Sequence, residues 1–156
     1  MAKLAVGDAI PEFTLKDDEG ADVARADLLG EGPLVLYFYP RDDTPGCTVE
    51  SCTFRDTHED FADAGARVVG VSADGVASHA AFKAKHSLPF TLLCDTDNAL
   101  RRAFGVSSTL GILPGRVTYV VDSDGVIRHI FSSQLRVKTH VQEALRIVRE
   151  LADSKD

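Results

Sequence analysis

The stretch LYFYPRDDTPGCTVESCTFRD, residues 36–56, joins a strongly apolar segment to a helix start and contains two of the three cysteines in the chain. Pro40 ends the apolar segment, because proline cannot donate to the hydrogen bonds of a central strand. Thr44 is a favourable residue for the N-cap of a helix, and Pro45 suits the first helical position, where its missing N–H costs nothing. The stretch predicts a buried strand, an exposed turn and a helix that begins at Pro45.

The two cysteines of this stretch occupy different positions in the predicted helix. Cys47 falls at the third helical position, over backbone N–H groups without a helical partner and at the positive end of the helix dipole, and both features favour a thiolate. A helix over residues 45–64 places Cys47, Phe54 and His58 on the face toward the sheet, and Cys52 about 140° away among polar residues. Cys47 is therefore expected to face inward and Cys52 outward.

The spacing of the two cysteines argues against a permanent crosslink. In an ideal helix their Cα atoms are about 8.6 Å apart, farther than the roughly 7 Å that a disulfide can span. Cys47 and Cys52 can therefore bond only if the first helical turns unwind. This geometry suits a catalytic disulfide that is made and broken in each turnover.

Apolar runs and helix-like segments alternate along the rest of the chain, which favours an α/β fold. The apolar runs are typical of central strands, and DSDG predicts that the last two form an antiparallel hairpin at the sheet edge. A further hairpin is expected near the N-terminus, within FTLKDDEGADV. The pattern fits a thioredoxin-like sheet and equally permits another doubly wound arrangement. The expected strands are 34–39, 67–73, 90–94, 117–121 and 126–131, and the expected helices are 45–64, 76–87, 97–104 and 139–152.

The composition limits the classes of partner. The 156 residues, 44% of them hydrophobic, fit one domain over 1–156, and no linker or repeat divides them. The net charge of −7, without a basic run, does not suggest a nucleic-acid or membrane partner. No signal peptide or long apolar segment is apparent, so we expect a cytoplasmic protein.

Several ordinary roles of cysteine compete with catalysis. Two buried structural thiols are one alternative, although the position of Cys47 and the polar neighbours of Cys52 argue against it. A zinc half-site also fits the spacing, but no second pair of ligands accompanies it and the histidines are scattered. The C-x-x-C motif of dithiol exchangers is absent. Cys94, in the apolar run FTLLCD, is expected to be a core residue.

Residues 40–47, P-R-D-D-T-P-G-C, match the P-x-x-x-T-x-x-C motif of the peroxiredoxins. With Cys52 five positions after Cys47, the chain resembles the bacterioferritin comigratory protein group, or Q type. The segments GDAIPEFTLKDDEG, VVGVSAD and GRVTYVVDSDGVIRHIF are similar to the family's opening, a later strand and its closing hairpin. The resemblance implies a single-domain thioredoxin-like fold with an additional N-terminal hairpin, and an antioxidant enzyme that reduces hydrogen peroxide and organic hydroperoxides.

The resemblance also implies roles for individual residues. Cys47 would be the peroxidatic cysteine and Cys52 the resolving cysteine. Thr44 would place its hydroxyl near the sulfur, Pro40 would shield the pocket from water, and Arg116 would be the pocket arginine. A further residue, Glu50, matches a position that is often acidic in the family, although a solvated helix carboxylate explains it equally well.

The same resemblance implies the partners. No metal, haem, flavin or nucleotide is required, and the reductant would be thioredoxin or a similar dithiol. We expect a monomer or weak dimer. Two other functions remain open at this point: a general thiol-disulfide oxidoreductase that acts on proteins, and a non-enzymatic redox sensor that uses oxidation of Cys47 as a signal.

Overall fold

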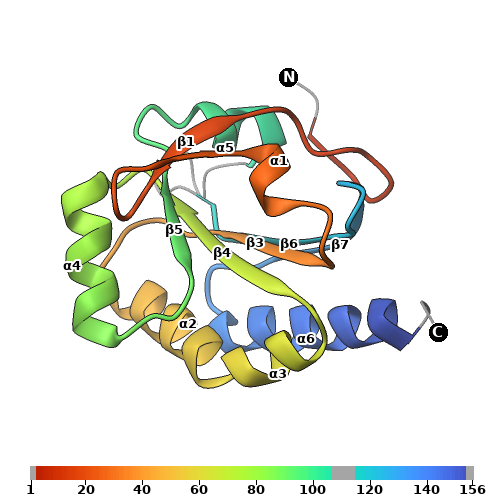
Figure 1. Cartoon of the computed structure of the whole chain (residues 1–156). Helices are drawn as coiled ribbons and strands as arrows, with labels where there is room; N and C mark the ends of the chain where they lie inside the picture. The colour runs from red at the N-terminus through yellow and green to blue at the C-terminus, as the bar shows by residue number, and fades with distance from the viewer. Residues whose placement is uncertain (1–2, 107–114, 154–156) are drawn as a thin grey trace.

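The computed structural model describes residues 3–106 and 115–153, whose strands form one seven-stranded sheet (Figure 1). The strand order is β2-β1-β5-β4-β3-β6-β7. Strands β3, β4 and β5 are parallel, whereas β6 is antiparallel to β3 and pairs with β7 as a hairpin. The strands are β1 (Thr14–Asp17), β2 (Asp22–Ala24), β3 (Leu34–Phe38), β4 (Arg67–Ser72), β5 (Thr91–Cys94), β6 (Val117–Val121) and β7 (Ile127–Ser132).

Helices cover both faces of the sheet, as the parallel connections require. In Figure 1, α2, α3 and α6 lie together on one side of the sheet, and α1 and α5 lie on the other. No helix among the described residues is long and apolar enough to cross a membrane. The helices are α1 (Arg25–Leu28), α2 (Pro45–Asp56), α3 (His58–Asp63), α4 (Val76–His86), α5 (Ala99–Phe104) and α6 (Val137–Asp153).

Strand β3 shows how the sequence builds two cores. All five of its residues are buried, and successive side chains point to opposite faces. Val35 and Tyr37 join the core under α2, α3, α4 and α6, whereas Leu36 and Phe38 join the core under α1 and α5. The continuous apolar run therefore has the expected meaning, a central strand that is covered on both faces.

The predicted helix over 45–64 is wrong in one respect, because it is two helices. α2 ends at Asp56 and α3 begins at His58. Thr57 separates them, and its hydroxyl donates to the carbonyl of Thr53 at 2.6 Å. Such bonding of a hydroxyl to the preceding turn competes with regular helix geometry. The break leaves His58 half-buried at the first position of α3.

The other elements follow the predictions closely, with shifts at their ends. The N-terminal hairpin is present as β1 and β2, which join the sheet through β5. The last helix begins at Val137, two residues earlier than predicted, and α5 begins at Ala99, two residues later. Asn98 precedes α5 with φ of 60°, a left-handed conformation that excludes it from the helix.

Candidate active site

Cys47 lies where β3 leads into α2, at the carboxyl end of a central parallel strand. Pro45 occupies the first helical position, as predicted, and Cys47 is the third residue of the helix. The side chain of Cys47 is 1% exposed, whereas Cys52, on the same helix, is half-buried. The inward and outward orientations of the two thiols therefore agree with the prediction. All three cysteines are free.

Packing of α2 on the sheet fixes the position of Cys47. The ring of Phe54 stacks on the ring of Tyr37 in β3, with centroids 4.5 Å apart. One turn closer to Cys47, the hydroxyls of Ser51 and Tyr37 are 2.9 Å apart and hydrogen-bonded. A stacked aromatic pair and a buried hydrogen bond each contribute about 1 kcal/mol. Both hold the helix in register with the strand beneath it.

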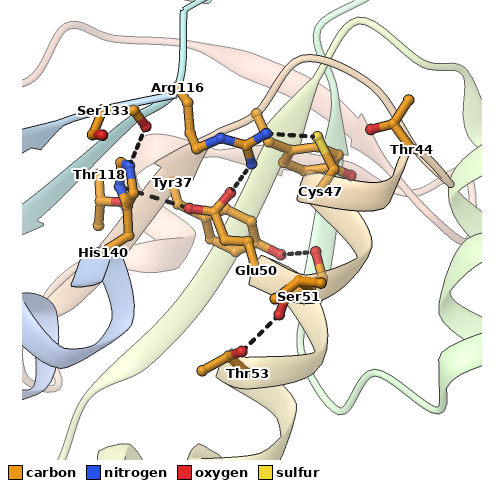
Figure 2. Close-up of polar contacts among 12 residues, drawn as sticks. Tyr37, Thr44, Cys47, Glu50, Ser51, Thr53, Arg116, Thr118, Ser133 and His140 are labelled. Atoms are coloured by element: carbon orange, nitrogen blue, oxygen red, sulfur yellow. Dashed lines mark hydrogen bonds and ion pairs between the residues drawn. The ribbon is translucent and has the colours of Figure 1, made fainter. Parts of the chain in front are cut away.

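Arg116 reaches Cys47 from the neighbouring strand (Figure 2). It directly precedes β6, whose first residue, Val117, pairs with Phe38 at the end of β3. The guanidinium is therefore delivered to the start of α2, where its Nη2 atom donates to Sγ of Cys47 at 3.4 Å. Its Nη1 atom donates to Oε1 of Glu50 at 2.6 Å. The structure thus brings Cys47, Glu50 and Arg116 into one buried cluster.

The charge of Arg116 is maintained although the side chain is only 5% exposed. Burial by itself lowers the pKa of Arg116, but the charges and hydrogen bonds of Glu50 and Cys47 outweigh burial and raise it. A fixed positive charge beside the sulfur stabilises a thiolate and any anion that forms next to it.

Glu50 is fully buried, so the interpretation of it as a solvated helix carboxylate is wrong. Helix α2 turns this side chain toward β6 and α6, because position 50 lies one turn after Cys47 on the packed face. Burial raises the pKa of Glu50 to about 7, even though the charge of Arg116 opposes this increase. The second carboxyl oxygen, Oε2, has no hydrogen-bond partner.

His140 is a residue of this region that the sequence pattern did not indicate as a site residue. It lies on α6, is fully buried, and places Nδ1 at 3.6 Å from Oε2 of Glu50. The ring also contacts Oγ1 of Thr118 at 2.8 Å and the carbonyl of Ser133 at 2.7 Å. Its position beside Val141 on the apolar face of an amphipathic helix was the available sequence signal.

Thr44 and Pro40 lie in the segment that joins β3 to α2, and Thr44 does not cap the helix with its side chain. The backbone of Thr44 has the extended N-cap conformation, and its carbonyl accepts the first helical bond from Thr48. Its hydroxyl donates to the carbonyl of Arg41 at 2.9 Å. Because this bond closes the turn before α2, the side chain is not available to cap the helix. Pro40 directly follows the buried residue Tyr39 and is itself half-buried.

The turn between Pro40 and Thr44 is held by a buried network. Asp42 accepts hydrogen bonds from the hydroxyl of Tyr39 at 2.5 Å and that of Ser78 at 2.8 Å. Nδ1 of His79 is 2.7 Å from the same carboxylate, and the backbone N–H of Asp42 donates to Asp74 at 2.8 Å. The candidate ligand atoms of Asp42, Asp74 and His79 lie within 4.8 Å of one another. Because these carboxylates are already engaged by the protein, we interpret the cluster as support for the turn.

A second buried arginine, Arg101, connects the two strands that carry the site. It extends from α5, and its guanidinium donates to the carbonyl of Tyr39 at 2.9 Å and to that of Gly115 at 2.6 Å. These carbonyls belong to the residues directly before Pro40 and Arg116. Arg101 therefore fixes the separation of the two segments that meet at Cys47, a role that no sequence motif indicated.

Cys94 lies at the end of β5 and is 5% exposed, in agreement with the predicted core position. Its Sγ atom is 3.7 Å from the carbonyl of Asp17. Burial raises the pKa of Cys94 to about 11, and neighbouring aspartates contribute to the increase. A thiol in these surroundings stays protonated and is a poor nucleophile near neutral pH.

The comparisons with known proteins agree with this geometry. Residues 6–130 match the AhpC/TSA family, and the chain belongs to that family. Within it, the chain is 48% identical over 150 residues to peroxiredoxin Q of Oryza sativa subsp. japonica, a chloroplastic protein, with 96% of this chain and 69% of the relative covered. Peroxiredoxin Q of Arabidopsis thaliana is also 48% identical, with 95% and 68% covered.

Solved structures give the same assignment. Peroxidoxin BcpB from Mycobacterium tuberculosis superposes with a TM-score of 0.87 at 37% identity, covering 94% of this chain and 97% of that protein. The bacterioferritin comigratory protein of Xanthomonas campestris gives 0.82 at 33% identity, covering 93% and 99%. The predicted Q-type resemblance and thioredoxin-like fold are thus confirmed, and membership of this group implies a thiol-dependent peroxidase.

Proposed function

We propose that the protein reduces hydrogen peroxide and organic hydroperoxides with Cys47 as the nucleophile, Cys52 as the resolving thiol and thioredoxin or a similar dithiol as the reductant. The observation that carries the proposal is the contact of Arg116 with the Cys47 sulfur at 3.4 Å, inside a buried cluster. The Xanthomonas campestris bacterioferritin comigratory protein is described as having alkyl peroxide reduction activity, which supports the inclusion of organic hydroperoxides.

In the first step, the Cys47 thiolate attacks one oxygen of the peroxide and the O–O bond breaks. The departing oxygen keeps the bonding electron pair and takes a proton, so it leaves as water or an alcohol, while Cys47 becomes a sulfenic acid. Arg116 and the unpaired N–H groups at the start of α2 stabilise the negative charge on the departing oxygen. Both donors are fixed before the substrate arrives.

In the second step, the Cys52 sulfur attacks the sulfenic acid, water leaves, and the Cys47–Cys52 disulfide forms. An external dithiol then reduces this disulfide through a mixed disulfide and is itself oxidised. The partly exposed position of Cys52 suits this exchange, because an incoming dithiol needs access to one of the two sulfurs.

The decisive experiment follows NADPH consumption with thioredoxin, its reductase and peroxide. We expect Cys47→Ser to abolish turnover, because serine supplies no thiolate. Cys52→Ser should consume about one equivalent of peroxide and then stop, because its sulfenic acid has no internal partner. Cys94→Ser is the matched control and should turn over like the parent.

The same assay separates the two alternative functions. A general thiol-disulfide oxidoreductase would exchange disulfides with unfolded proteins and turn over little peroxide. A redox sensor would form an oxidised species that thioredoxin does not recycle. Peroxide turnover retained in Cys47→Ser would refute the proposal, and full turnover in Cys52→Ser would remove the resolving role of that residue.

A further inference from the structure

The buried carboxyl group of Glu50 has two unequal oxygens. Oε1 accepts a hydrogen bond from Arg116 at 2.6 Å. Oε2 is equally buried, has no hydrogen-bond partner and faces Nδ1 of His140 at 3.6 Å. A buried polar atom without a partner is costly and rare in folded proteins. The protonation state of the Glu50–His140 contact decides whether this atom is satisfied.

The contacts of His140 determine which of its nitrogens carries hydrogen. Nε2 lies 2.7 Å from the carbonyl of Ser133, and because a carbonyl can only accept, Nε2 is the protonated nitrogen. In the neutral ring Nδ1 is then an acceptor, which the hydroxyl of Thr118 contacts at 2.8 Å. An ionised Glu50 would direct a second acceptor at this nitrogen. A proton on Oε2 turns the same contact into an attraction.

Burial favours placing that proton on Glu50, and the charge of Arg116 opposes it without outweighing it. Burial raises the pKa of Glu50 to about 7, and burial lowers the pKa of His140 to about 4. Arg116 faces both groups. Tyr37 faces Glu50 from β3, and burial keeps its phenol neutral by raising its pKa well above the usual value. Cys47 lies one turn away on α2, and Phe131 contributes only an uncharged ring against His140.

We propose that His140 is a positioning residue for peroxide reduction, whose Nδ1 lone pair faces Oε2 of Glu50 and favours a proton on that oxygen, which keeps Glu50 neutral beside Arg116. With Glu50 neutral, no carboxylate offsets the charge of Arg116, and that charge acts fully on the Cys47 thiolate and the departing oxygen. With Glu50 ionised, Arg116 is shared between two anions. The inference rests on the proposed role of Cys47 and adds a proton-binding group to it.

The test measures the second-order rate constant of Cys47 oxidation by hydrogen peroxide between pH 5 and 9, by rapid quench and mass spectrometry. Once the thiolate has formed, the rate constant of the parent should fall by about tenfold as Glu50 ionises. This effect is smaller than the ~10²–10³-fold loss expected when a donor such as Arg116 is removed entirely. In Glu50→Gln this fall should be absent, because the amide cannot ionise.

Two further variants should shift, in opposite directions, the pH at which the rate constant falls. His140→Phe keeps a ring but removes the acceptor, so the fall should shift to lower pH by about one unit. Thr118→Val removes the competing hydroxyl and should shift the fall to higher pH. In a Glu50→Gln background neither substitution should create a pH dependence. His129→Gln is the matched control. His129 lies on β7 and contacts Glu143 of α6 at 3.2 Å, which is also a histidine–glutamate contact but lies away from the site. The pH profile of this variant should match that of the parent.

An infrared measurement separates this inference from the proposed function. The C=O band of a protonated carboxyl group should be present at pH 6, disappear as the pH passes about 7, and be missing from Glu50→Gln. If the band titrates but the protein does not react with peroxide, the proposed function fails and the proton site stands. Peroxide reactivity with unchanged profiles in His140→Phe and Thr118→Val would overturn the inference alone.

Discussion

A β-carbon built on Gly46 would lie 3.0 Å from Nη2 of Arg116 and 3.8 Å from its Cζ atom. The first distance is tighter than an ordinary van der Waals contact, and Nη2 is the atom that donates to the Cys47 sulfur. Gly46 therefore provides the space in which the guanidinium approaches the sulfur. Its backbone is in the ordinary helical region, so the requirement is for space and not for an unusual conformation.

We predict that Gly46→Ala lowers the activity without lowering the stability. Alanine is favoured over glycine inside a helix by about 1 kcal/mol, so the free energy of unfolding should rise or stay the same. The added methyl group displaces Arg116, and a displacement of this kind can lower the rate with peroxide by about 10²-fold. Urea unfolding and the peroxide rate constant are the two measurements.

Gly75→Ala is the matched control for this substitution. Gly75 precedes α4, and a β-carbon there would meet no atom within 4 Å. Its activity should equal that of the parent. If Gly46→Ala also kept the parent rate, the guanidinium would not need the space that Gly46 leaves.

Arg116→Met should slow the reaction of Cys47 with peroxide by about 10²–10³-fold, even at a pH where the thiolate is fully formed, because the departing oxygen loses a charged donor. At a pH where Glu50 is ionised, the substitution also leaves a buried carboxylate without its cation, which by itself can cost several kcal/mol of stability. The double variant Arg116→Met, Glu50→Gln removes that cost and isolates the kinetic effect.

The rate constant is measured at several pH values by rapid quench. Arg128→Met serves as the control, because Arg128 is a half-exposed arginine that pairs with Asp122 at the sheet edge. Equal rate constants in the folded double variant and the parent would show that Arg116 does not stabilise the transition state.

Local signals explain why the strand, turn and helix at Cys47 could be predicted. Pro40 and Pro45 constrain the backbone, and Thr44 has the N-cap conformation that its residue type favours. Arg116 is different, since it is 69 positions from Cys47 and reaches it only because β6 pairs with β3. Nothing in the spacing gives that pairing, and only the family resemblance indicated this arginine.

Glu50 and His140 could not be paired from the sequence for the same physical reason. The burial of Glu50 depends on the packing of α2 against both β6 and α6, and a carboxylate on a helix is usually solvated. The break at Thr57 was equally hidden, because threonine is only mildly unfavourable within a helix. These features arise from contacts between elements distant in the chain.

His79 predicts a pH dependence of stability. Burial alone lowers the pKa of His79, but its hydrogen bond to Asp42 and the charge of that carboxylate outweigh burial, and the pKa is raised above 6.5. A raised pKa in the folded state means that the protonated ring stabilises the fold below pH 6.5 and that this stabilisation is lost as the pH rises through the folded-state pKa. Each unit of pKa difference corresponds to about 1.4 kcal/mol.

The measurement compares urea unfolding of the reduced parent and His79→Gln at pH 6 and pH 9. We expect the parent's advantage in free energy of unfolding to be larger at pH 6. Ser78→Ala removes a hydrogen bond to the same carboxylate without removing a titratable group, so its cost should be equal at both pH values. An advantage that is constant or grows toward pH 9 would contradict a protonated His79.

The final prediction concerns α2 when Cys47 and Cys52 form a disulfide. Both residues lie within one helix, about 8.6 Å apart between Cα atoms for ideal geometry, so bond formation should require the segment from Pro45 to Phe54 to unwind. Unwinding breaks the Ser51–Tyr37 hydrogen bond and removes the stacking of Phe54 on Tyr37. The oxidised protein should therefore be locally less protected.

Hydrogen exchange tests this on the reduced and oxidised protein. Amides of residues 47–54 should exchange at least about tenfold faster in the disulfide form, whereas those of β6, paired on both sides, should change little. Cys52→Ser treated with one equivalent of peroxide is the control, because it oxidises Cys47 without closing the disulfide and should keep its protection. If the oxidised parent remains equally protected across 47–54, non-reducing peptide mapping decides between the two remaining explanations. A mapped Cys47–Cys52 bond would show that α2 accommodates it without unwinding, and any other pairing would remove Cys52 from the resolving role.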